Sequence, residues 1–272
     1  ICSRLSTGWA TGWKICRKGI RHMRPLILHI PHSSARIPSR DGFLISEEML
    51  ANELDKLTDW YTDDLFCSDA DEMIIADFSR LFCDAERFED DRIEVMAKKG
   101  MGMLYHTTDS GLPMRRISAS LRRMILNEYY RPHHKKLRSV VEAHLRRYSR
   151  ATIIDCHSFP DTPLRRDSDL SPVRPDIDIG TDDFHTPKEY IDFSVHFFEK
   201  YGYTVEVNRP YSGTIVPVNF YRSDPRVNSI MIEVNRKLYL EGKSHSRSAG
   251  YPIIKNILSK YLSAVKEMSA FV

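Results

Sequence analysis

The chain has 272 residues, of which 42% are hydrophobic and 28% carry a charge. This length and composition fit one large domain with a substantial core, and no segment approaches the ~18 consecutive apolar residues that span a bilayer. The formal net charge is +3, but the first 22 residues hold five basic and no acidic side chains, which leaves 35 basic against 37 acidic residues beyond them. We therefore expect neither nucleic acid nor a membrane surface as a partner.

The first 22 residues lack the apolar stretch and small-residue cleavage site of a secretory signal. We expect residues 1–22 to be a disordered or over-annotated leader, with an amphipathic anchor as the alternative, and residues 23–272 to form a single domain. The five cysteines are widely spaced and show no paired metal-ligand spacing. This usage favours a reducing, cytoplasmic setting over a disulfide scaffold.

The first third of the chain predicts a strand, a helix and two further short strands. Residues 26–30 form an apolar run that stops at Pro31, as a buried strand does. Residues 46–66 follow a helical pattern with Ser46 as N-cap. Short apolar runs at 73–76 and 81–83 predict a strand pair or one kinked strand.

The middle of the chain predicts long helices followed by a central strand. Residues 89–111 are polar and contain glycine, which indicates a long excursion. Residues 114–147 have apolar side chains at helical spacing, interrupted at Pro132, so we expect two helices or one kinked helix. A compact strand at 151–155 precedes a polar, proline-punctuated segment at 161–186, whose length is typical of a functional loop.

The last third predicts a helix at 187–201, strands at 203–207 and 229–234, and a final helix at about 250–268. Strands that alternate with long helices favour a sheet covered on both faces. The expected fold is therefore a three-layer α/β/α sandwich with a mostly parallel, mixed central sheet.

Candidate catalytic residues stand where the predicted strands end. Ligands of an open α/β sheet bind beyond the carboxyl ends of its strands. His32 follows the first strand, His157 follows the central strand, and Glu233 lies in the strand near residue 230. In this architecture, two histidines and a glutamate at strand ends can converge on one point.

These residue types suit metal-dependent hydrolysis. A hydrolytic zinc site uses three protein ligands and one open position. His32, His157 and Asp59 are the predicted ligands of Zn²⁺ or another divalent metal, and Glu233 is the predicted general base. Asp59 and Asp63 are four residues apart, on one face of the predicted helix, so Asp63 is the alternative third ligand.

Other polar residues extend the predicted site. Asp155 lies two residues before His157 on the same side of an extended strand, where it can orient the imidazole. Arginines follow several strand-like runs, and a guanidinium group can grip a carboxylate with two hydrogen bonds. Each of these residues also has a structural interpretation, as a hydrogen-bonded strand-end histidine, a buried Glu233 paired with an arginine, or a surface ion pair. His133 and His134 lie on a basic helix, and we expect them on its solvated face.

Seven short motifs occur in an order that resembles one known family. In chain order, they are Pro31-His32-Ser33, Thr58-Asp59-Trp60-Tyr61, Phe78-Ser79-Arg80 leading to Asp84 and Arg87, Asp155-Cys156-His157-Ser158, Pro175-Asp176-Ile177-Asp178-Ile179-Gly180, Asn208-Arg209-Pro210-Tyr211-Ser212-Gly213, and Glu233-Val234-Asn235-Arg236. From about Leu26 to Leu240, the chain resembles the N-formylglutamate amidohydrolase family.

The resemblance implies a fold similar to that of zinc-dependent exopeptidases. It further implies His32, His157 and Asp59 as metal ligands, with Glu233 as catalytic base. The residues that it implies for substrate binding are Arg80, Arg87, Asn208, Tyr211 and Arg236. Two positions depart from the family pattern: Ser34 replaces a common glycine, and Glu86 replaces the usual asparagine. A carboxylate at position 86 would repel an acidic substrate if it faced the pocket.

The expected function is hydrolysis of a linear amide bond in a small, acidic N-acyl amino acid such as N-formylglutamate. A hydrolase of other N-acyl amino acids or peptides is the alternative within the same class. A non-catalytic protein that binds a small ligand on the same fold is the alternative from another class, although a binding protein has no need of the general base Glu233.

Overall fold

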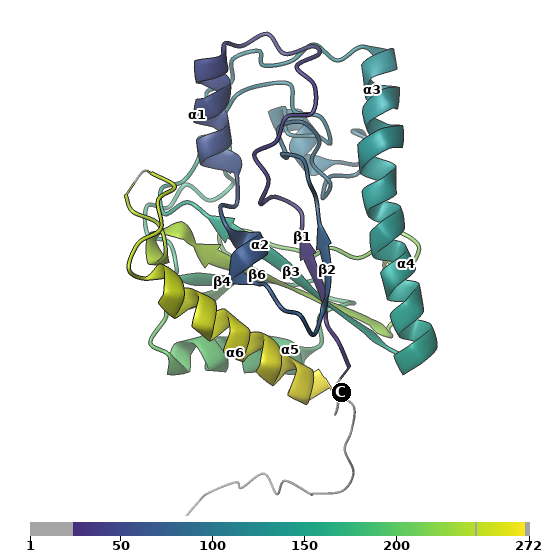
Figure 1. The fold of residues 1–272 in the computed structure, drawn as a ribbon, viewed down its shortest axis with the longest axis vertical. Helices are drawn as coiled ribbons and strands as arrows, with labels where there is room; N and C mark the ends of the chain where they lie inside the picture. Colours follow the sequence, from purple (N-terminus) through teal and green to yellow (C-terminus); the bar gives the residue numbers. More distant parts are fainter. Residues whose placement is uncertain (1–23, 243, 270–272) are drawn as a thin grey trace, which may run out of the picture.

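The computed structural model describes residues 24–242 and 244–269 and contains a six-stranded mixed sheet with the strand order β2-β1-β3-β6-β4-β5 (Figure 1). The strands are β1 (Ile27–Ile30), β2 (Glu72–Ile75), β3 (Ala151–Phe159), β4 (Ile177–Gly180), β5 (Val205–Val207) and β6 (Val227–Asn235). The expected α/β fold with a mixed central sheet is confirmed.

The strands run in two directions. β1 is parallel to β2 and β3, and β3 is parallel to β6. β4 is antiparallel to β6, while β5 is parallel to β4. The edge that carries the carboxyl ends of β1, β3 and β6 therefore lies opposite the edge where β4 and β5 end.

The α-helices are α1 (Glu47–Leu57), α2 (Thr62–Leu65), α3 (Ala119–Ile125), α4 (Arg131–Tyr148), α5 (Lys188–Lys200) and α6 (Tyr251–Ser269). Two 3₁₀ segments, η1 (Val95–Lys99) and η3 (Arg236–Leu238), and the π-helical turn η2 (Leu126–Tyr130) complete the set. Within the described part of the chain, no helix combines the length and apolar character needed to cross a membrane.

Side-chain alternation along the strands separates two layers of helices. Leu28, Ile154 and Ile232 share one core cluster with residues of α5 and α6. Ile153, one residue from Ile154, packs instead in a cluster with Leu137 of α4. Because successive strand residues point to opposite faces, α5 and α6 cover one face of the sheet and α4 covers the other. Figure 1 shows the two groups of helices on different sides of the strands.

The polar strand residues lie on the face of the sheet that α4 covers. His29 pairs with Asp155 between β1 and β3, and His157 pairs with Glu233 between β3 and β6. Asp155 and His157 have the same parity as Ile153, so they point away from the core under α5 and α6. The register thus aligns four polar side chains on one face.

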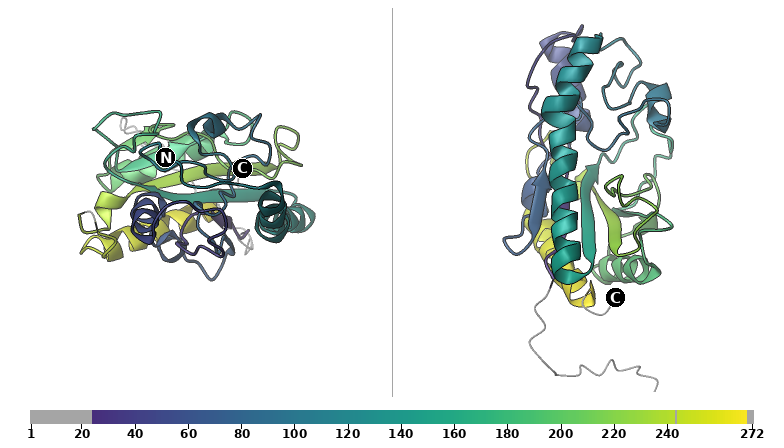
Figure 2. Two further views of the ribbon diagram at one scale, coloured as in Figure 1. Left: turned by 90° about the horizontal axis from the view of Figure 1, so that it is seen from above. Right: turned by 90° about the vertical axis from the view of Figure 1, so that its right-hand side faces the viewer.

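The helix over that face is long and has one irregular turn. α3, η2 and α4 follow one another without a break and run along one side of the molecule (Figure 2, right). Pro132 lies in the first turn of α4, where a missing backbone N–H is tolerated. The expected interruption at Pro132 is therefore a π-helical turn just before the proline rather than a gap between two helices.

Three local predictions differ from the structure. The helix expected at 46–66 is two helices, α1 and α2, separated at Thr58–Tyr61, where Tyr61 has a φ of 65°. Residues 81–83 form a turn rather than a strand, and the segment 161–186 contains β4. The leader expected at residues 1–22 lies outside the described residues.

Candidate metal centre and active site

His32 follows β1 directly and has one imidazole nitrogen without a partner. The nitrogen Nε2 is 3.0 Å from Asp84 Oδ1, which fixes the orientation of the ring. The nitrogen Nδ1 is buried and has no hydrogen-bond partner among the described residues. A buried imidazole nitrogen is normally paired, so this atom is a vacant donor that suits a metal ion.

Asp59 lies beside His32 because of the break between α1 and α2. The backbone N–H of Asp59 donates to the carbonyl oxygen of His32 over 2.9 Å. The carboxylate oxygen Oδ2 is 3.7 Å from His32 Nδ1, and Oδ1 accepts a hydrogen bond from Arg236 over 2.9 Å. Asp63, the alternative third ligand, lies in α2, exposed and outside this group.

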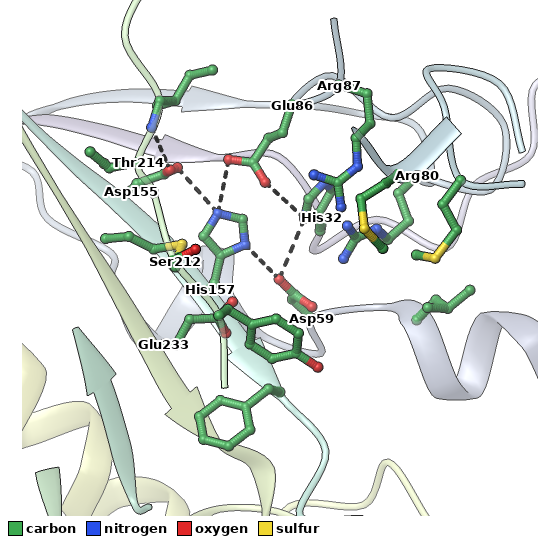
Figure 3. Close-up of a pocket in the computed structure, with 18 of the residues that line it drawn as sticks. His32, Asp59, Arg80, Glu86, Arg87, Asp155, His157, Ser212, Thr214 and Glu233 are labelled. Carbon is green, nitrogen blue, oxygen red and sulfur yellow. Dashed lines mark hydrogen bonds and ion pairs between the residues drawn. The ribbon is translucent and has the colours of Figure 1, made fainter. Parts of the chain in front are cut away.

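His157 completes the group from the centre of the sheet. The nitrogen Nδ1 is 3.0 Å from Asp59 Oδ2. The other nitrogen, Nε2, is 3.2 Å from Asp155 Oδ1 and 3.0 Å from Glu86 Oε1. Asp155 thus contacts the His157 imidazole at the nitrogen opposite the one that faces Asp59 (Figure 3).

The donor atoms of His32, Asp59 and His157 fit a divalent metal. They all lie within 4.8 Å of one another and are buried. Ligands bound to zinc at about 2 Å lie roughly 3.3 Å apart in a tetrahedral site, close to the 3.0 and 3.7 Å found here. In both histidines, a carboxylate holds the opposite ring nitrogen, as is common for metal-binding histidines.

Two further groups of residues bring possible ligand atoms together, His29 with Glu86 and Asp155, and His32 with Asp84 and Glu86. In each group, a histidine is already joined to an aspartate: His29 Nδ1 to Asp155 over 2.8 Å, and His32 Nε2 to Asp84 over 3.0 Å. These contacts have the geometry of hydrogen bonds that support ligands. The group formed by His32, Asp59 and His157 is the candidate metal centre, because it is the one of the three with two histidines and all of its members are buried.

Charges in the site favour an ionised Asp59. Burial raises the pKa of Asp59, but hydrogen bonds to His157 and His32 lower it more, so the pKa lies below its ordinary value. Burial lowers the pKa of His157, whereas Glu86 and Asp155 raise it, and the net pKa is well above the ordinary value. A metal ion would replace the proton that His157 holds among these carboxylates.

Glu233 has the surroundings of a general base. It lies directly opposite His157 in the pairing of β3 and β6. Burial raises the pKa of Glu233 well above its ordinary value, and the positive charge of His157 only partly offsets this, while Asp59 and Asp178 raise the pKa further. Its oxygen Oε2 is buried without a hydrogen-bond partner among the described residues. The carboxylate is therefore held next to the candidate metal centre with one acceptor unused.

The predicted substrate-binding residues separate into three groups. Arg80, Arg87 and Tyr211 line the cavity beside the histidines. Arg236 also lines it, but its guanidinium donates to Asp59 and to the carbonyl oxygens of Lys56 and Ser158, which makes it a support for Asp59. The structure does not bring Asn208 into the cavity, since its amide is bonded to Thr181.

Sequence reasoning overlooked the residues that hold the histidines in place. Asp84 accepts hydrogen bonds from His32, Arg80 and Tyr105. In the sequence, the one indication of its role is its position in the motif that leads from Asp84 to Arg87. His29 links Asp155 to His133, whose Nε2 is 2.9 Å from His29 Nε2.

The expectation of a solvated face for His133 and His134 is wrong. His133 is buried and His134 is half-buried against Tyr130. The reason is that the helix face that carries His133 is directed toward the strands, where His133 contacts His29 of β1.

The cavity above these residues has a volume of about 590 Å³. This volume is within the usual range for small-molecule sites. The walls come from the loops at 86–101 and 210–221 as well as from β3 and β6. The carboxyl ends of the parallel strands thus form the floor of a site open to a small substrate.

The fold and this site together define an α/β protein with a candidate mononuclear metal centre of the His/Asp/His type and a buried glutamate beside it. A family model described as N-formylglutamate amidohydrolase matches residues 24–240. The chain belongs to that family, and it is accordingly a hydrolase that acts on linear amide bonds.

Individual relatives agree with this assignment. The chain is similar to a protein named N-formylglutamate deformylase from Pseudomonas putida, with 23% identity over 229 residues that cover 80% of this chain and 82% of the relative. It is also similar to the crystal structure of an N-formylglutamate amidohydrolase from Ralstonia eutropha JMP134. That match has a TM-score of 0.79 and 25% identity and covers 90% of this chain and 93% of the other. A gene product of Agrobacterium tumefaciens shares the fold, with a TM-score of 0.61 and 16% identity over 90% of this chain and 92% of that one.

Proposed function

We propose that the protein is a metal-dependent amidohydrolase that releases formate from N-formyl amino acids, N-formylglutamate among them. Family membership supports the reaction and the bond that is cleaved. One observation carries the metal dependence: the donor atoms of His32, Asp59 and His157 converge on one buried point beside Glu233. Zinc is the first choice because imidazole and carboxylate ligands suit it.

A divalent metal held by these residues would supply Lewis acidity, which polarises the amide carbonyl and makes a nearby water more acidic. Glu233 takes a proton from that water, because its raised pKa makes its carboxylate a stronger base than that of an ordinary glutamate. The water oxygen adds to the formyl carbon, and the protonated Glu233 then passes its proton to the amide nitrogen as the carbon–nitrogen bond breaks. The products are formate and the free amino acid, so atoms and charge balance.

The remaining residues bind and orient. Asp84 and Asp155 hold the His32 and His157 rings from behind. Arg236 holds Asp59, and Arg80 and Arg87 present positive charge to a carboxylate of the substrate. These supports keep the reacting groups in position with little reorganisation.

The proposal is tested with purified protein whose metal content is measured by elemental analysis and whose formate release is assayed with N-formyl amino acids. We expect a single zinc per chain after reconstitution, and loss of both zinc and turnover in His32→Ala and His157→Ala. His196→Ala, an exposed histidine on α5, is the matched control and is expected to keep both. Turnover in reconstituted protein that binds no metal would overturn the mechanism, and a metal-loaded protein without turnover would favour a ligand-binding role.

A further inference from the structure

The cavity carries more negative than positive side chains. Seven carboxylates but only four lysine or arginine side chains line it. Two of the seven carboxylates are paired with arginines outside the lining, Asp167 with Arg174 and Asp182 with Arg222, so five carboxylates face four cations. The cavity therefore offers little uncompensated positive charge from its side chains to a substrate that brings two carboxylates of its own.

Most of the positive charge in the cavity is already engaged. Lys56 is 2.8 Å from Glu53, Arg80 is 3.0 Å from Asp84, and Arg236 is 2.9 Å from Asp59. Arg87 differs, since its guanidinium donates no hydrogen bond to any described residue and lies 3.7 Å from Asp84. One guanidinium can hold one carboxylate in a bidentate contact, so the cavity is equipped for a single acidic group.

Glu86 places a negative charge on the cavity wall, directly beside the candidate metal centre. Its carboxylate is 3.0 Å from His157 Nε2 and 3.6 Å from His32 Nδ1, and its side chain is 15% exposed toward the cavity. Figure 3 shows the Glu86 carboxylate directed toward both His157 and His32. Like charges held at such short range in a partly desolvated site repel strongly.

The mouth of the cavity is apolar. Phe88 and Val95 on one loop and Val218 and Tyr221 on the other line the cavity, yet 39 to 79% of each remains exposed. Exposed apolar side chains that gather around a cavity mark a binding surface for an apolar group. The side chain of formylglutamate, with two methylene groups and a carboxylate, offers these residues less apolar surface than a fully aliphatic side chain would.

We infer that the substrate of this site is an N-formyl amino acid with one carboxylate and an apolar side chain, and that Glu86 selects against the second carboxylate of glutamate. The inference rests on the proposed function and narrows its substrate class. Arg87 holds the single carboxylate, and the apolar mouth covers the side chain.

The test compares kcat/KM of the zinc-loaded enzyme for N-formyl-leucine and N-formylglutamate. We expect at least a tenfold preference for N-formyl-leucine. Glu86→Gln should raise kcat/KM for N-formylglutamate about tenfold relative to that for N-formyl-leucine. Glu89→Gln removes a nearby charge outside the cavity lining and is the matched control, expected to leave the ratio unchanged. Because the readout is a ratio for two substrates, a general change in metal content or folding does not produce it.

A second pair of substitutions tests the apolar mouth. Val95→Ser with Val218→Ser changes two highly exposed side chains, so folding is retained. We expect kcat/KM for N-formyl-leucine to fall about tenfold with little change for N-formylglutamate. A wild-type preference for N-formylglutamate would overturn the inference but not the proposed function. The same holds if Glu86→Gln leaves the ratio of the two kcat/KM values unchanged. Failure of the metal-loaded enzyme to hydrolyse either substrate would instead overturn the proposed function.

Discussion

Asp84 lies 52 residues beyond His32 in the chain, yet its carboxylate oxygen Oδ1 is 3.0 Å from the Nε2 nitrogen of His32. Asp84 is fully buried and also accepts hydrogen bonds from Arg80 and Tyr105. Burial raises the pKa of Asp84, but Arg80 and His32 lower it more, so the net pKa is well below the ordinary value. The contact leaves Nδ1 as the imidazole nitrogen directed toward Asp59.

Asp84→Asn should weaken metal binding. The amide is a weaker acceptor for the His32 ring, so we expect zinc affinity to fall 10- to 100-fold. Competition with a chromophoric chelator measures the dissociation constant, and thermal unfolding of the same sample checks the fold. Asp77→Asn, at an exposed aspartate, is the control. An unchanged dissociation constant would mean that Asp84 does not orient His32.

Glu233→Gln should remove proton transfer and keep the metal. Glutamine cannot accept the proton, so kcat should fall by roughly 10²- to 10⁴-fold. Elemental analysis should give the wild-type zinc content, because Glu233 is not among the candidate ligands. The exposed Glu241→Gln should match the wild type in both measurements. A variant with wild-type kcat would exclude Glu233 as the base.

Arg236→Ala should destabilise the metal-free protein more than the zinc-loaded protein. The substitution leaves Asp59 buried without its arginine partner, which typically costs about 3–5 kcal/mol. A metal bound to Asp59 would compensate part of that charge, so urea unfolding with and without zinc should give different losses. Arg222→Ala, at a largely exposed arginine, should cost less than about 1 kcal/mol in both forms. Equal losses in the two forms would argue against Asp59 as a ligand.

Protonation of His134 should contribute a loss of stability as the pH drops below about 6.5. Burial, with a smaller contribution from the charge of His29, lowers the pKa of His134 to about 4. Between pH 6.5 and 4, the unfolded chain binds a proton that the folded protein does not, so the free energy of unfolding decreases as pH falls. The full effect is on the order of 3 kcal/mol. Urea unfolding at several pH values across this range should show that the free energy of unfolding depends less steeply on pH in His134→Gln than in the wild type. An identical pH dependence would exclude His134 as the source.

The candidate site residues that the sequence indicates most directly lie on the parallel strands. His32, His157 and Glu233 follow or end apolar runs, and three parallel strands bring their carboxyl ends to one edge of the sheet. The rule depends on strand direction, however. Asn208 follows β5, which runs opposite to β6, and its amide is bonded to Thr181 outside the cavity, whereas Tyr211, three residues later, reaches the cavity lining.

The supporting network could not be predicted because it depends on contacts between distant loops. Asp84 directly follows residues 81–83, which were predicted as a strand but form a turn, and Asp59 lies in a break within a segment predicted as one helix. His29 looks like an ordinary strand residue until the register pairs it with Asp155. Local periodicity identifies apolar faces but carries no information on which buried polar groups will satisfy one another.

The π-helical turn between α3 and α4 also affects how this chain should be compared with others. In this turn, the N–H of Arg131 donates to the carbonyl of Leu126, five residues back, so the turn accommodates one residue more than an α-helical turn. An alignment with a relative whose helix is regular throughout would need a one-residue gap between Leu126 and Arg131. Without that gap, every α4 position shifts by about 100° around the helix axis, and His133 would be matched to a residue that points away from the sheet.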